Sequence, residues 1–378
     1  MSASGAAAPG PAAAGSAPEA APASRPAGAD PAALPPTMRA ARFHGPGDLR
    51  VETVPVPRPG PGELLVEVAA AATNGTDAKS LRRGHPVLLP DPPCGFGHEW
   101  AGTVAALGAG VEGFAAGDRV TGANSAPCGH CRPCRRGEPS RCTDLPPYLN
   151  GAYAEYLLLP ARLVAANVVA VPDGMPLELA AIVQTVACCV HGAEIAGAGP
   201  GMTVAVLGLG PIGLGLVAAC HARGARVLGV GRRRAERLRL AGAFGAEAAL
   251  TDPDELAGLT GGEGPDVVVE AVGQPQAWSQ AVAAVRRGGT VVLFGGLPRG
   301  EVPLDPYRIH YHELTLRGSY HHTPAAIRQA LALLAGGAYP FAELLTHAYP
   351  LERVAEPLAQ AAGLADPDDR LLKAVIRP

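Results

Sequence analysis

Residues 203–220 read Thr-Val-Ala-Val-Leu-Gly-Leu-Gly-Pro-Ile-Gly-Leu-Gly-Leu-Val-Ala-Ala-Cys, and this stretch decides the fold of the second half of the chain. Four of its first five residues are apolar and predict a strand, whereas the apolar run at its end predicts a helix. A G-x-G-x-x-G turn lies between them, and such a turn lets backbone amides approach a pyrophosphate at the positive end of the helix. We therefore predict a dinucleotide-binding site formed by Gly208, Gly210, Pro211, Ile212 and Gly213.

Alternating strand and helix patterns continue from this stretch. Apolar segments predict strands at 203–208, 226–230, 266–271 and 290–294, with helical patterns between them. Alternation of this kind gives a parallel, doubly wound sheet. We therefore predict an α/β fold with three parts: a mostly β domain over 38–187, a dinucleotide-binding domain over 188–323, and a segment, 324–378, that returns to complete the mostly β domain.

Residues 1–37 consist mainly of Ala, Pro, Gly and Ser, so we predict that this tail is disordered and that Met38 is a candidate start site. The tail lacks the basic start and unbroken apolar run of a signal peptide, which favours a cytoplasmic protein. The uncharged stretch 202–220 is long enough to span a membrane, but its glycines favour a soluble core. With 31 basic and 34 acidic residues, the chain has no excess of positive charge for binding nucleic acid.

The predicted strand at 226–230 is followed by Gly231-Arg232-Arg233-Arg234, and this segment indicates which dinucleotide binds. An Asp or Glu about 20 residues beyond the glycine turn would hydrogen-bond the ribose 2′-hydroxyl of NAD. Here no carboxylate is present to repel a 2′-phosphate, and guanidinium groups pair well with phosphate. The sequence therefore favours NADP(H) over NAD(H), bound by Arg232, Arg233 and Arg234. A solvated, arginine-rich helix start is the alternative.

Four of the eight cysteines lie close together, as Cys128, Cys131, Cys134 and Cys142, in a C-x2-C-x2-C-x7-C pattern. Four thiolates at this spacing can form the tetrahedral shell of one structural Zn²⁺ ion. An iron–sulfur cluster is the main alternative, but bacterial ferredoxin spacing ends in x3-C-P. Disulfides are less expected, because nothing marks the chain for export. A closed four-thiolate site does no chemistry, so the function must lie elsewhere.

Two further motifs are Gly97-His98-Glu99 and Gly117-Asp118-Arg119-Val120. With the four cysteines and the late glycine turn, they resemble the medium-chain dehydrogenase/reductase superfamily over residues 38–378, most closely its zinc-containing alcohol and polyol dehydrogenase branch. The resemblance implies a GroES-like domain, a Rossmann domain, a small-molecule substrate and a homodimer or homotetramer. In that branch a catalytic zinc ion polarises the substrate oxygen while the nicotinamide exchanges hydride with the carbon.

The chain departs from this family at the catalytic zinc ligands. In the family, one zinc ligand is the Cys of a C-G-T/S-D motif, and this chain has Asn74-Gly75-Thr76-Asp77 there. Another ligand is a later Cys, Glu or Asp, and this chain has Gln184 at that position. Carboxamide oxygens are poor zinc ligands, and replacing two anions removes charge that stabilises the ion. His98 and Glu99 remain as a degraded metal site, so we expect no catalytic zinc. Cys94 is a conceivable substitute ligand, although burial as a small apolar residue is favoured.

Other side chains must then carry the proton. In the family, a Thr or Ser two residues after the missing Cys and a His five residues after it pass the proton through the cofactor ribose; Thr76 and Lys79 occupy these positions. A lysine near an apolar pocket can have its pKa lowered, whereas an arginine cannot release its proton. We predict that Thr76, Lys79 and His98 stabilise or protonate the developing oxyanion. A Lys79 that binds cofactor ribose or phosphate, or is simply exposed, is the alternative.

Four histidines follow one another closely near the predicted return between the domains: His310, His312, His321 and His322. We expect them to cluster there. A histidine pair can suggest a metal site, but a role in lining a cleft or an interface is favoured.

Three functions remain open on the sequence. The leading one is hydride transfer between NADP(H) and an alcohol/carbonyl pair, with a polyol, sugar or cyclitol as the guessed substrate. Zinc-free members of the superfamily also carry Asn at the position of Asn74, so reduction of an activated C=C bond, of the enone or quinone type, is the second. A cofactor-binding protein that has lost turnover is the third.

Overall fold

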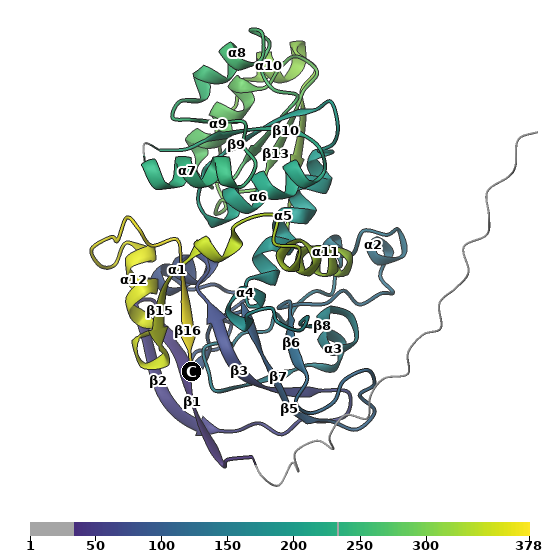
Figure 1. Ribbon diagram of the computed structural model, residues 1–378, viewed down its shortest axis with the longest axis vertical. Helices are drawn as coiled ribbons and strands as arrows, with labels where there is room; N and C mark the ends of the chain where they lie inside the picture. The colour runs from purple at the N-terminus through teal and green to yellow at the C-terminus, as the bar shows by residue number, and fades with distance from the viewer. Residues whose placement is uncertain (1–33, 233) are drawn as a thin grey trace, which may run out of the picture.

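The computed structural model describes residues 34–232 and 234–378, which form two domains, with the Rossmann domain uppermost in Figure 1. The predictions made for residues 1–33 and for Arg233 lie outside the described residues. In the described part, no helix is long and apolar enough to cross a membrane. The helical and strand segments confirm the predicted α/β class, with a parallel doubly wound sheet beside a mostly β domain.

The Rossmann domain is built on a six-stranded parallel sheet in the order β11-β10-β9-β12-β13-β14. Its strands are β9 (Thr203–Leu207), β10 (Arg226–Val230), β11 (Ala248–Leu250), β12 (Val267–Glu270), β13 (Thr290–Leu293) and β14 (Thr315–Gly318). Its helices are α6 (Pro211–Ala222), α7 (Ala235–Ala243), α8 (Leu256–Leu259), α9 (Pro275–Ala284) and α10 (Pro306–Tyr311). The central strands β9 and β12 are buried on both faces, which explains the apolar runs at 204–207 and 267–269. The sequence predicted four of the strands but neither edge strand, β11 nor β14.

The GroES-like domain contains two sheets. A small sheet holds β1 (Thr37–Gly45), β2 (Asp48–Pro55) and β4 (Cys94–Gly95). The larger sheet holds β3 (Leu64–Ala72), β5 (Trp100–Leu107), β6 (Arg119–Gly122), β7 (Tyr156–Leu159), β8 (Val168–Ala170), β15 (Leu345–Pro350) and β16 (Lys373–Arg377). Its helices are α1 (Gly75–Arg83), α2 (Arg132–Arg135), α3 (Ala161–Asn167), α4 (Leu177–Ala180), α11 (Pro324–Ala335) and α12 (Ala355–Ala362). The last strand of the chain, β16, lies inside the larger sheet, where it pairs antiparallel with β3 and parallel with β15.

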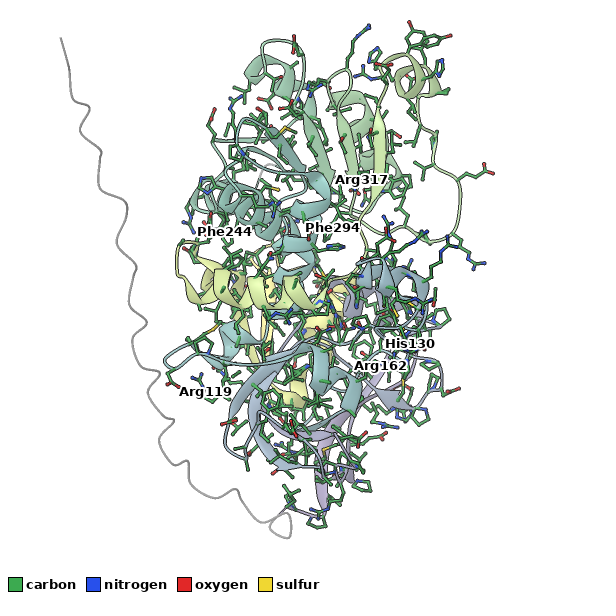
Figure 2. All side chains as sticks on the ribbon, turned by 90° about the vertical axis from the view of Figure 1, so that its right-hand side faces the viewer. Arg119, His130, Arg162, Phe244, Phe294 and Arg317 are labelled. Atoms are coloured by element: carbon green, nitrogen blue, oxygen red, sulfur yellow. The ribbon has the colours of Figure 1, made fainter. Side chains whose placement is uncertain are left out.

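Helix α5 (Val183–Ala196) is shared by the two domains. A Cβ atom at Gly192 would lie 2.9 Å from the ring of Phe294, so this helix approaches the end of β13 closely. The guanidinium of Arg317 donates a hydrogen bond of 2.9 Å to the carbonyl oxygen of Ile195; Phe294 and Arg317 are labelled at this edge of the Rossmann domain in Figure 2. Helices α6 and α11 both pack against α5. One hydrophobic cluster therefore runs from the GroES-like sheet through α5 into the Rossmann domain.

Candidate functional site

The glycine turn joins the end of β9 to the start of α6. Gly208 has a φ of 102°, in the left-handed region that favours glycine. A Cβ atom at Gly213 would lie 1.7 Å from the carbonyl oxygen of Gly208, so only glycine fits there. Gly210 caps α6, and Pro211 occupies its first turn. Beside the turn, which also includes Ile212, lies a cavity of about 480 Å³, and the turn and cavity together fit a dinucleotide.

Arginines surround the end of this cavity that lies beyond β10. Arg232 is exposed and lines the cavity, and Arg234 lines it while forming an ion pair of 2.7 Å with Asp369 of the GroES-like domain. The sequence did not single out Arg237, which lines the same cavity and whose Nε atom is buried without a hydrogen-bond partner among the described residues. Burial and the neighbouring charge of Arg234 lower the pKa of Arg237. Among the described residues, Asp369 is the one carboxylate paired with these arginines. A bound phosphate group would therefore neutralise more of their positive charge.

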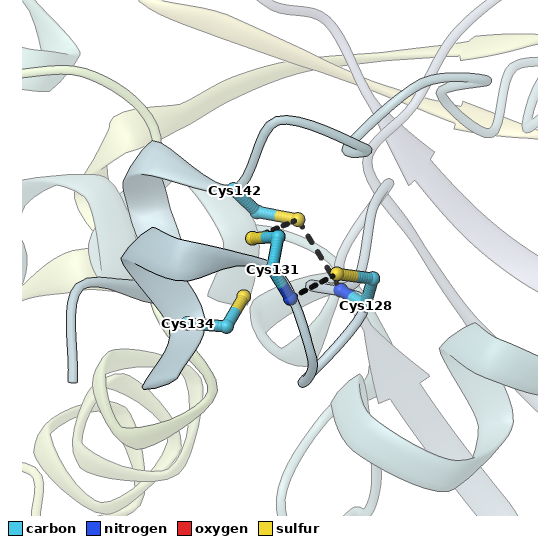
Figure 3. A group of neighbouring side chains, drawn as sticks. All are labelled: Cys128, Cys131, Cys134 and Cys142. Atoms are coloured by element: carbon cyan, nitrogen blue, oxygen red, sulfur yellow. Dashed lines mark hydrogen bonds between the residues drawn. The ribbon is translucent and has the colours of Figure 1, made fainter. Parts of the chain in front are cut away.

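The four cysteines of the C-x2-C-x2-C-x7-C segment come together around α2, as Figure 3 shows for Cys128, Cys131, Cys134 and Cys142. Tetrahedral zinc with Zn–S bonds of about 2.3 Å places its sulfur atoms about 3.8 Å apart, and the Sγ atoms of Cys131 and Cys142 are 3.8 Å apart. Backbone N–H groups of Cys134 and Thr143 lower the pKa of Cys131 to about 6, whereas burial and the neighbouring Cys131 side chain raise the pKa of Cys134 to about 12. The four thiols therefore fit a structural zinc ion.

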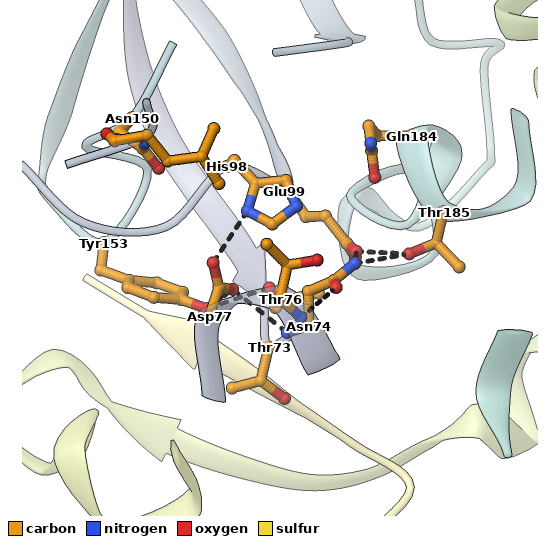
Figure 4. Close-up of polar contacts among 12 residues, drawn as sticks. Thr73, Asn74, Thr76, Asp77, His98, Glu99, Asn150, Tyr153, Gln184 and Thr185 are labelled. Carbon is orange, nitrogen blue, oxygen red and sulfur yellow. Dashed lines mark hydrogen bonds and ion pairs between the residues drawn. The ribbon is translucent and has the colours of Figure 1, made fainter. Parts of the chain in front are cut away.

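Asn74 lies where the family places its cysteine, and both ends of its side-chain amide have partners. Its Oδ1 accepts a hydrogen bond of 2.8 Å from the backbone N–H of Thr76 and so caps the start of α1. Its Nδ2 donates to Oε1 of Glu99 and, over 3.1 Å, to Oγ1 of Thr185 (Figure 4). Asn74 thus serves as a structural link between α1, α5 and the residue that precedes β5 (Trp100–Leu107).

Glu99 forms a buried ion pair that the sequence did not reveal. The Nζ atom of Lys373, from β16, lies 2.8 Å from Oε2 of Glu99. Lys373 is 2% exposed and Glu99 is fully buried. The ammonium group also donates a hydrogen bond of 2.7 Å to the carbonyl oxygen of Thr73, and the Thr185 hydroxyl donates to Glu99. The negative charge of Glu99 is therefore already balanced by a cation of the chain itself.

His98 is held by a second buried carboxylate. Its Nδ1 lies 2.8 Å from Oδ1 of Asp77, and the hydroxyl of Tyr153 donates a hydrogen bond of 2.6 Å to the other oxygen of Asp77. Burial opposes a charge on His98, but the Asp77 carboxylate outweighs burial, so the pKa of His98 is raised. Because Asp77 engages Nδ1, only Nε2 of His98 is left to contact a substrate.

The remaining residues do not rebuild a catalytic zinc shell. Gln184 lies in the first turn of α5 and donates from Nε2 to Sγ of Cys188 over 3.6 Å. Cys94, the conceivable substitute ligand, sits in β4 and pairs with Phe43. Within residues 34–232 and 234–378, the four-cysteine group is the one set of three or more His, Cys, Asp or Glu side chains close enough to share a metal.

Lys79 reaches across the domain boundary from α1. Its Nζ atom lies 3.5 Å from the position that a Cβ atom would take at Gly273, in the loop after β12. Burial lowers the pKa of Lys79; the charge of Arg83 adds to this shift, and that of Glu270 opposes it. Lys79 lines a second interdomain cavity, of about 450 Å³, together with Asn74, Thr185, Pro211 and Ile212. This cavity adjoins the glycine turn, so Lys79 lies beside the path expected for the cofactor.

The four histidines expected together are separated. His310 and His312 lie at the end of α10, where their rings contact Tyr311 and Tyr307. His321 and His322 lie in the loop between β14 and α11, and their ring centroids are 3.9 Å apart. The expected single cluster was wrong because β14 runs along the edge of the sheet between the two pairs and carries them apart.

Comparisons with known proteins agree with this architecture. The alcohol dehydrogenase GroES-like domain matches residues 60–173, and the zinc-binding dehydrogenase family matches residues 211–336. The chain is 31% identical to sorbitol dehydrogenase of Bacillus subtilis over 338 residues, covering 87% of this chain and 94% of that relative. It is 33% identical to L-threonine 3-dehydrogenase of Xanthomonas euvesicatoria over 319 residues, covering 80% of this chain and 89% of that relative.

A solved structure extends the similarity to three dimensions. The crystal structure of a zinc-binding dehydrogenase from Sinorhizobium meliloti bound to NADP superimposes with a TM-score of 0.81 and 32% identity, covering 90% of this chain and 99% of that one. The two domains, the four-cysteine site and the glycine turn therefore have one common explanation. The chain belongs to the family of NAD(P)-dependent, zinc-containing medium-chain alcohol and polyol dehydrogenases.

Proposed function

We propose that this protein is an NADP(H)-dependent oxidoreductase that interconverts an alcohol and a carbonyl compound without a catalytic zinc ion. A polyol, sugar or cyclitol is the substrate class suggested by the sorbitol dehydrogenase relative. The single observation that carries the absence of catalytic zinc is the bonding of Asn74. Its amide oxygen caps α1 and its amide nitrogen binds Glu99 and Thr185, so neither end can turn to a metal without breaking these bonds.

Charge supports the same proposal. Zinc sites of this family include anionic ligands, which offset the positive charge of the ion. Here the positions of two such ligands carry the neutral amides of Asn74 and Gln184, and the nearby Glu99 is neutralised by Lys373 at 2.8 Å. A divalent ion placed here would meet His98 and two neutral amides, without a free anionic ligand to offset its charge. The residues present therefore do not fit a catalytic zinc ion, and we derive no step through one.

Without a catalytic zinc ion, side chains of the protein must stabilise the substrate oxygen and supply the proton. When bound, the nicotinamide of the cofactor would supply or accept the hydride. In the reducing direction the carbonyl oxygen gains negative charge, and hydrogen-bond donors beside it lower the barrier. We assign this stabilisation to the Thr76 hydroxyl and to Nε2 of His98, which Asp77 holds in place and whose pKa it raises. Lys79, whose pKa burial lowers, is assigned to deliver the proton.

The preference for NADP(H) is supported by charge at the end of β10. Arg232, Arg234 and Arg237 line the cavity, and Asp369 is the carboxylate that pairs with one of them. A ribose 2′-phosphate would supply the missing negative charge. The Sinorhizobium relative was solved with NADP bound, which agrees with this assignment. We further propose one zinc ion per chain, at the four cysteines, and a homodimer or homotetramer as the assembled form.

Metal content and substrate panels test the proposal. Elemental analysis of the purified protein should find one zinc per chain, and a second equivalent would refute the zinc-free mechanism. NADPH oxidation should be faster with ketones than with enones. Faster reduction of enones would favour C=C reduction instead, and cofactor binding without turnover on either panel would favour a binding protein.

A further inference from the structure

A third cavity lies in the Rossmann domain, at the edge of the sheet opposite the cofactor site. Its volume is about 540 Å³, and its lining residues lie in α10 and in the loops that lead into β12, β13 and β14. The cofactor cavity is instead lined by the glycine turn and the loop after β12, at the carboxyl ends of the strands. Helices α8 and α10, which precede two of these loops, lie at the end of the Rossmann domain farthest from the GroES-like domain (Figure 1). We name this space the distal cavity; its lining includes Glu263, Val285, Arg286, Arg287, Arg308 and His312.

Hydrogen bonds hold the lining residues of the distal cavity together. The backbone N–H of Gly288 donates to the carbonyl oxygen of His312 over 2.7 Å, so the loop into β13 lies against the end of α10. Arg308 lies one helical turn before His312, and its Nη2 donates to the carbonyl oxygen of Val285 over 3.2 Å. The guanidinium of Arg308 is therefore fixed at the start of the segment that carries the other two arginines.

The distal cavity carries more positive charge than its carboxylates balance. Arg286 forms an ion pair of 2.7 Å with Asp266. The guanidinium of Arg308 donates to two backbone carbonyl oxygens and forms no ion pair with a described residue. Arg287 is exposed and likewise forms no ion pair with a described residue. Glu263 is the one carboxylate among the described lining residues, and it is exposed, so an anion would balance charges that the protein leaves open.

A ring nitrogen of His312 adds a polar atom without a partner. Nδ1 of His312 is buried and has no hydrogen-bond partner among the described residues. Desolvation lowers the pKa of His312, and the charges of Arg287 and Arg308 lower it further, whereas that of Asp305 opposes the shift. The ring is therefore neutral near pH 7, and one of its nitrogens can donate a hydrogen bond. A buried polar atom of this kind is costly unless a ligand or water binds it.

Exposed aromatic rings adjoin these cations on α10. Tyr307 is 62% exposed and Tyr311 is 63% exposed, and their ring centroids are 4.6 Å apart. The ring of Tyr307 also meets that of His312 edge-on, with the centroids 6.3 Å apart. Large aromatic rings are seldom left in solvent without a function, and a tyrosine face can stack on a nucleobase. An aromatic surface therefore lies directly beside the arginines that could bind a phosphate group.

We propose that the distal cavity binds a nucleoside monophosphate, at a site separate from that of the NAD(P)(H) cofactor. Arg287 and Arg308 would pair with the phosphate, and Nδ1 of His312 would donate a hydrogen bond to one of its oxygens. The base would stack on Tyr307 at the rim of the cavity. The volume of the distal cavity lies within the range of about 300–1,000 Å³ that is usual for small-molecule sites. Because the two sites lie at opposite edges of the sheet, both ligands could be bound together.

Three matched ligands test this inference by isothermal titration calorimetry: AMP, ribose 5-phosphate, which lacks the base, and adenosine, which lacks the phosphate. The cofactor site is kept occupied by NADPH, or by NADH if NADPH does not bind. We expect AMP to bind with a Kd about tenfold or more below that of either fragment. Loss of AMP binding when the cofactor is present would overturn the separate site. Equal affinities for AMP and ribose 5-phosphate would overturn the assignment of a nucleotide.

Variants with exposed side chains locate the bound AMP. Arg287→Ala should raise the Kd for AMP and for ribose 5-phosphate by about tenfold, because a cation is lost. Tyr307→Ala should raise the Kd for AMP by about tenfold and leave that for ribose 5-phosphate unchanged. Arg328→Ala, which removes an exposed arginine from α11, is the matched control and should change neither value. An unchanged Kd for AMP in Arg287→Ala would overturn the phosphate site, and an unchanged Kd in Tyr307→Ala would overturn the stacking of the base.

Discussion

The ammonium group of Lys373 lies 2.8 Å from a carboxylate oxygen of Glu99, and both side chains are buried in the GroES-like domain. Lys373→Met leaves Glu99 as an unpaired buried charge, so the free energy of unfolding should fall by about 3–5 kcal/mol. Urea denaturation measures this change. Adding Glu99→Gln to the same variant should restore much of the lost stability, since the unpaired charge is then removed.

Lys79→Met is the matched control for this change. It replaces the other lysine of the chain, which lies in α1 and forms no ion pair with a described residue, and should alter the free energy of unfolding by no more than about 0.5 kcal/mol. Equal effects of Lys373→Met and Lys79→Met would contradict the importance of the Glu99 pair.

The replaced ligands can be put back. Asn74→Cys combined with Gln184→Glu adds two anionic ligands near His98, and the zinc content should rise from one to two ions per chain. Asn74→Ser is the control, because serine still caps α1 but offers zinc no thiolate. Elemental analysis of the three proteins distinguishes them. If the double variant still holds one zinc, the substitutions at Asn74 and Gln184 do not explain the missing metal.

Arg237 should determine the choice of cofactor. Arg237→Ala removes a cation from the cavity, so Kd for NADPH should rise by about tenfold or more while Kd for NADH changes little. Asp369→Asn should have the opposite effect, tightening NADPH a few fold because Arg234 loses its carboxylate partner. Quenching of protein fluorescence by added NADPH or NADH measures the two Kd values for each variant. Arg239→Ala, on the same helix but paired with Glu236 and Glu343, should change neither constant.

Proton delivery by Lys79 predicts a pH dependence with a definite sign. Ketone reduction consumes a proton, so kcat/KM should fall as pH rises through the pKa of Lys79, which burial places below the usual 10.5. Lys79→Arg keeps the charge but cannot release the proton. It should therefore slow reduction by about 100-fold and abolish this alkaline limb. Normal turnover in Lys79→Arg, with a raised KM for NADPH in Lys79→Ala, would show that Lys79 only binds the cofactor.

Local sequence patterns were sufficient to predict part of this structure. The glycine turn at Gly208–Gly213 and the apolar strands around it identified the parallel sheet, because strand, turn and helix follow one another directly in the sequence. The four cysteines were equally readable, since they span a short loop. The edge strands β11 and β14 were missed because each is short and partly exposed, and so lacks a long apolar run.

The polar contacts of the site were harder to predict. Glu99 and Lys373 are 274 residues apart, and no pattern within either segment links them. The one available signal was the rarity of lysine, which occurs only twice in the chain, but rarity alone does not pair Lys373 with Glu99. Tyr153 likewise could not be identified as the partner of Asp77, because Tyr153 lies in the segment before β7 and Asp77 in α1, and only the folded domain brings them together. Arg237 could have been found, since it lies one helical turn after Arg234 at the start of α7.

The position of β16 also constrains how the protein can be made. The Rossmann sheet is complete within residues 203–318, whereas the pair between Glu99 and Lys373 needs a residue that the ribosome adds 274 positions after Glu99. During synthesis the GroES-like domain therefore cannot be completed while the intervening Rossmann domain forms. Until β16 has been synthesised, the carboxylate of Glu99 lacks the cation that balances it in the folded protein. Assembly of the site is thus a late event in translation, and nascent chains arrested before β16 should be the ones that chaperones and proteases recognise.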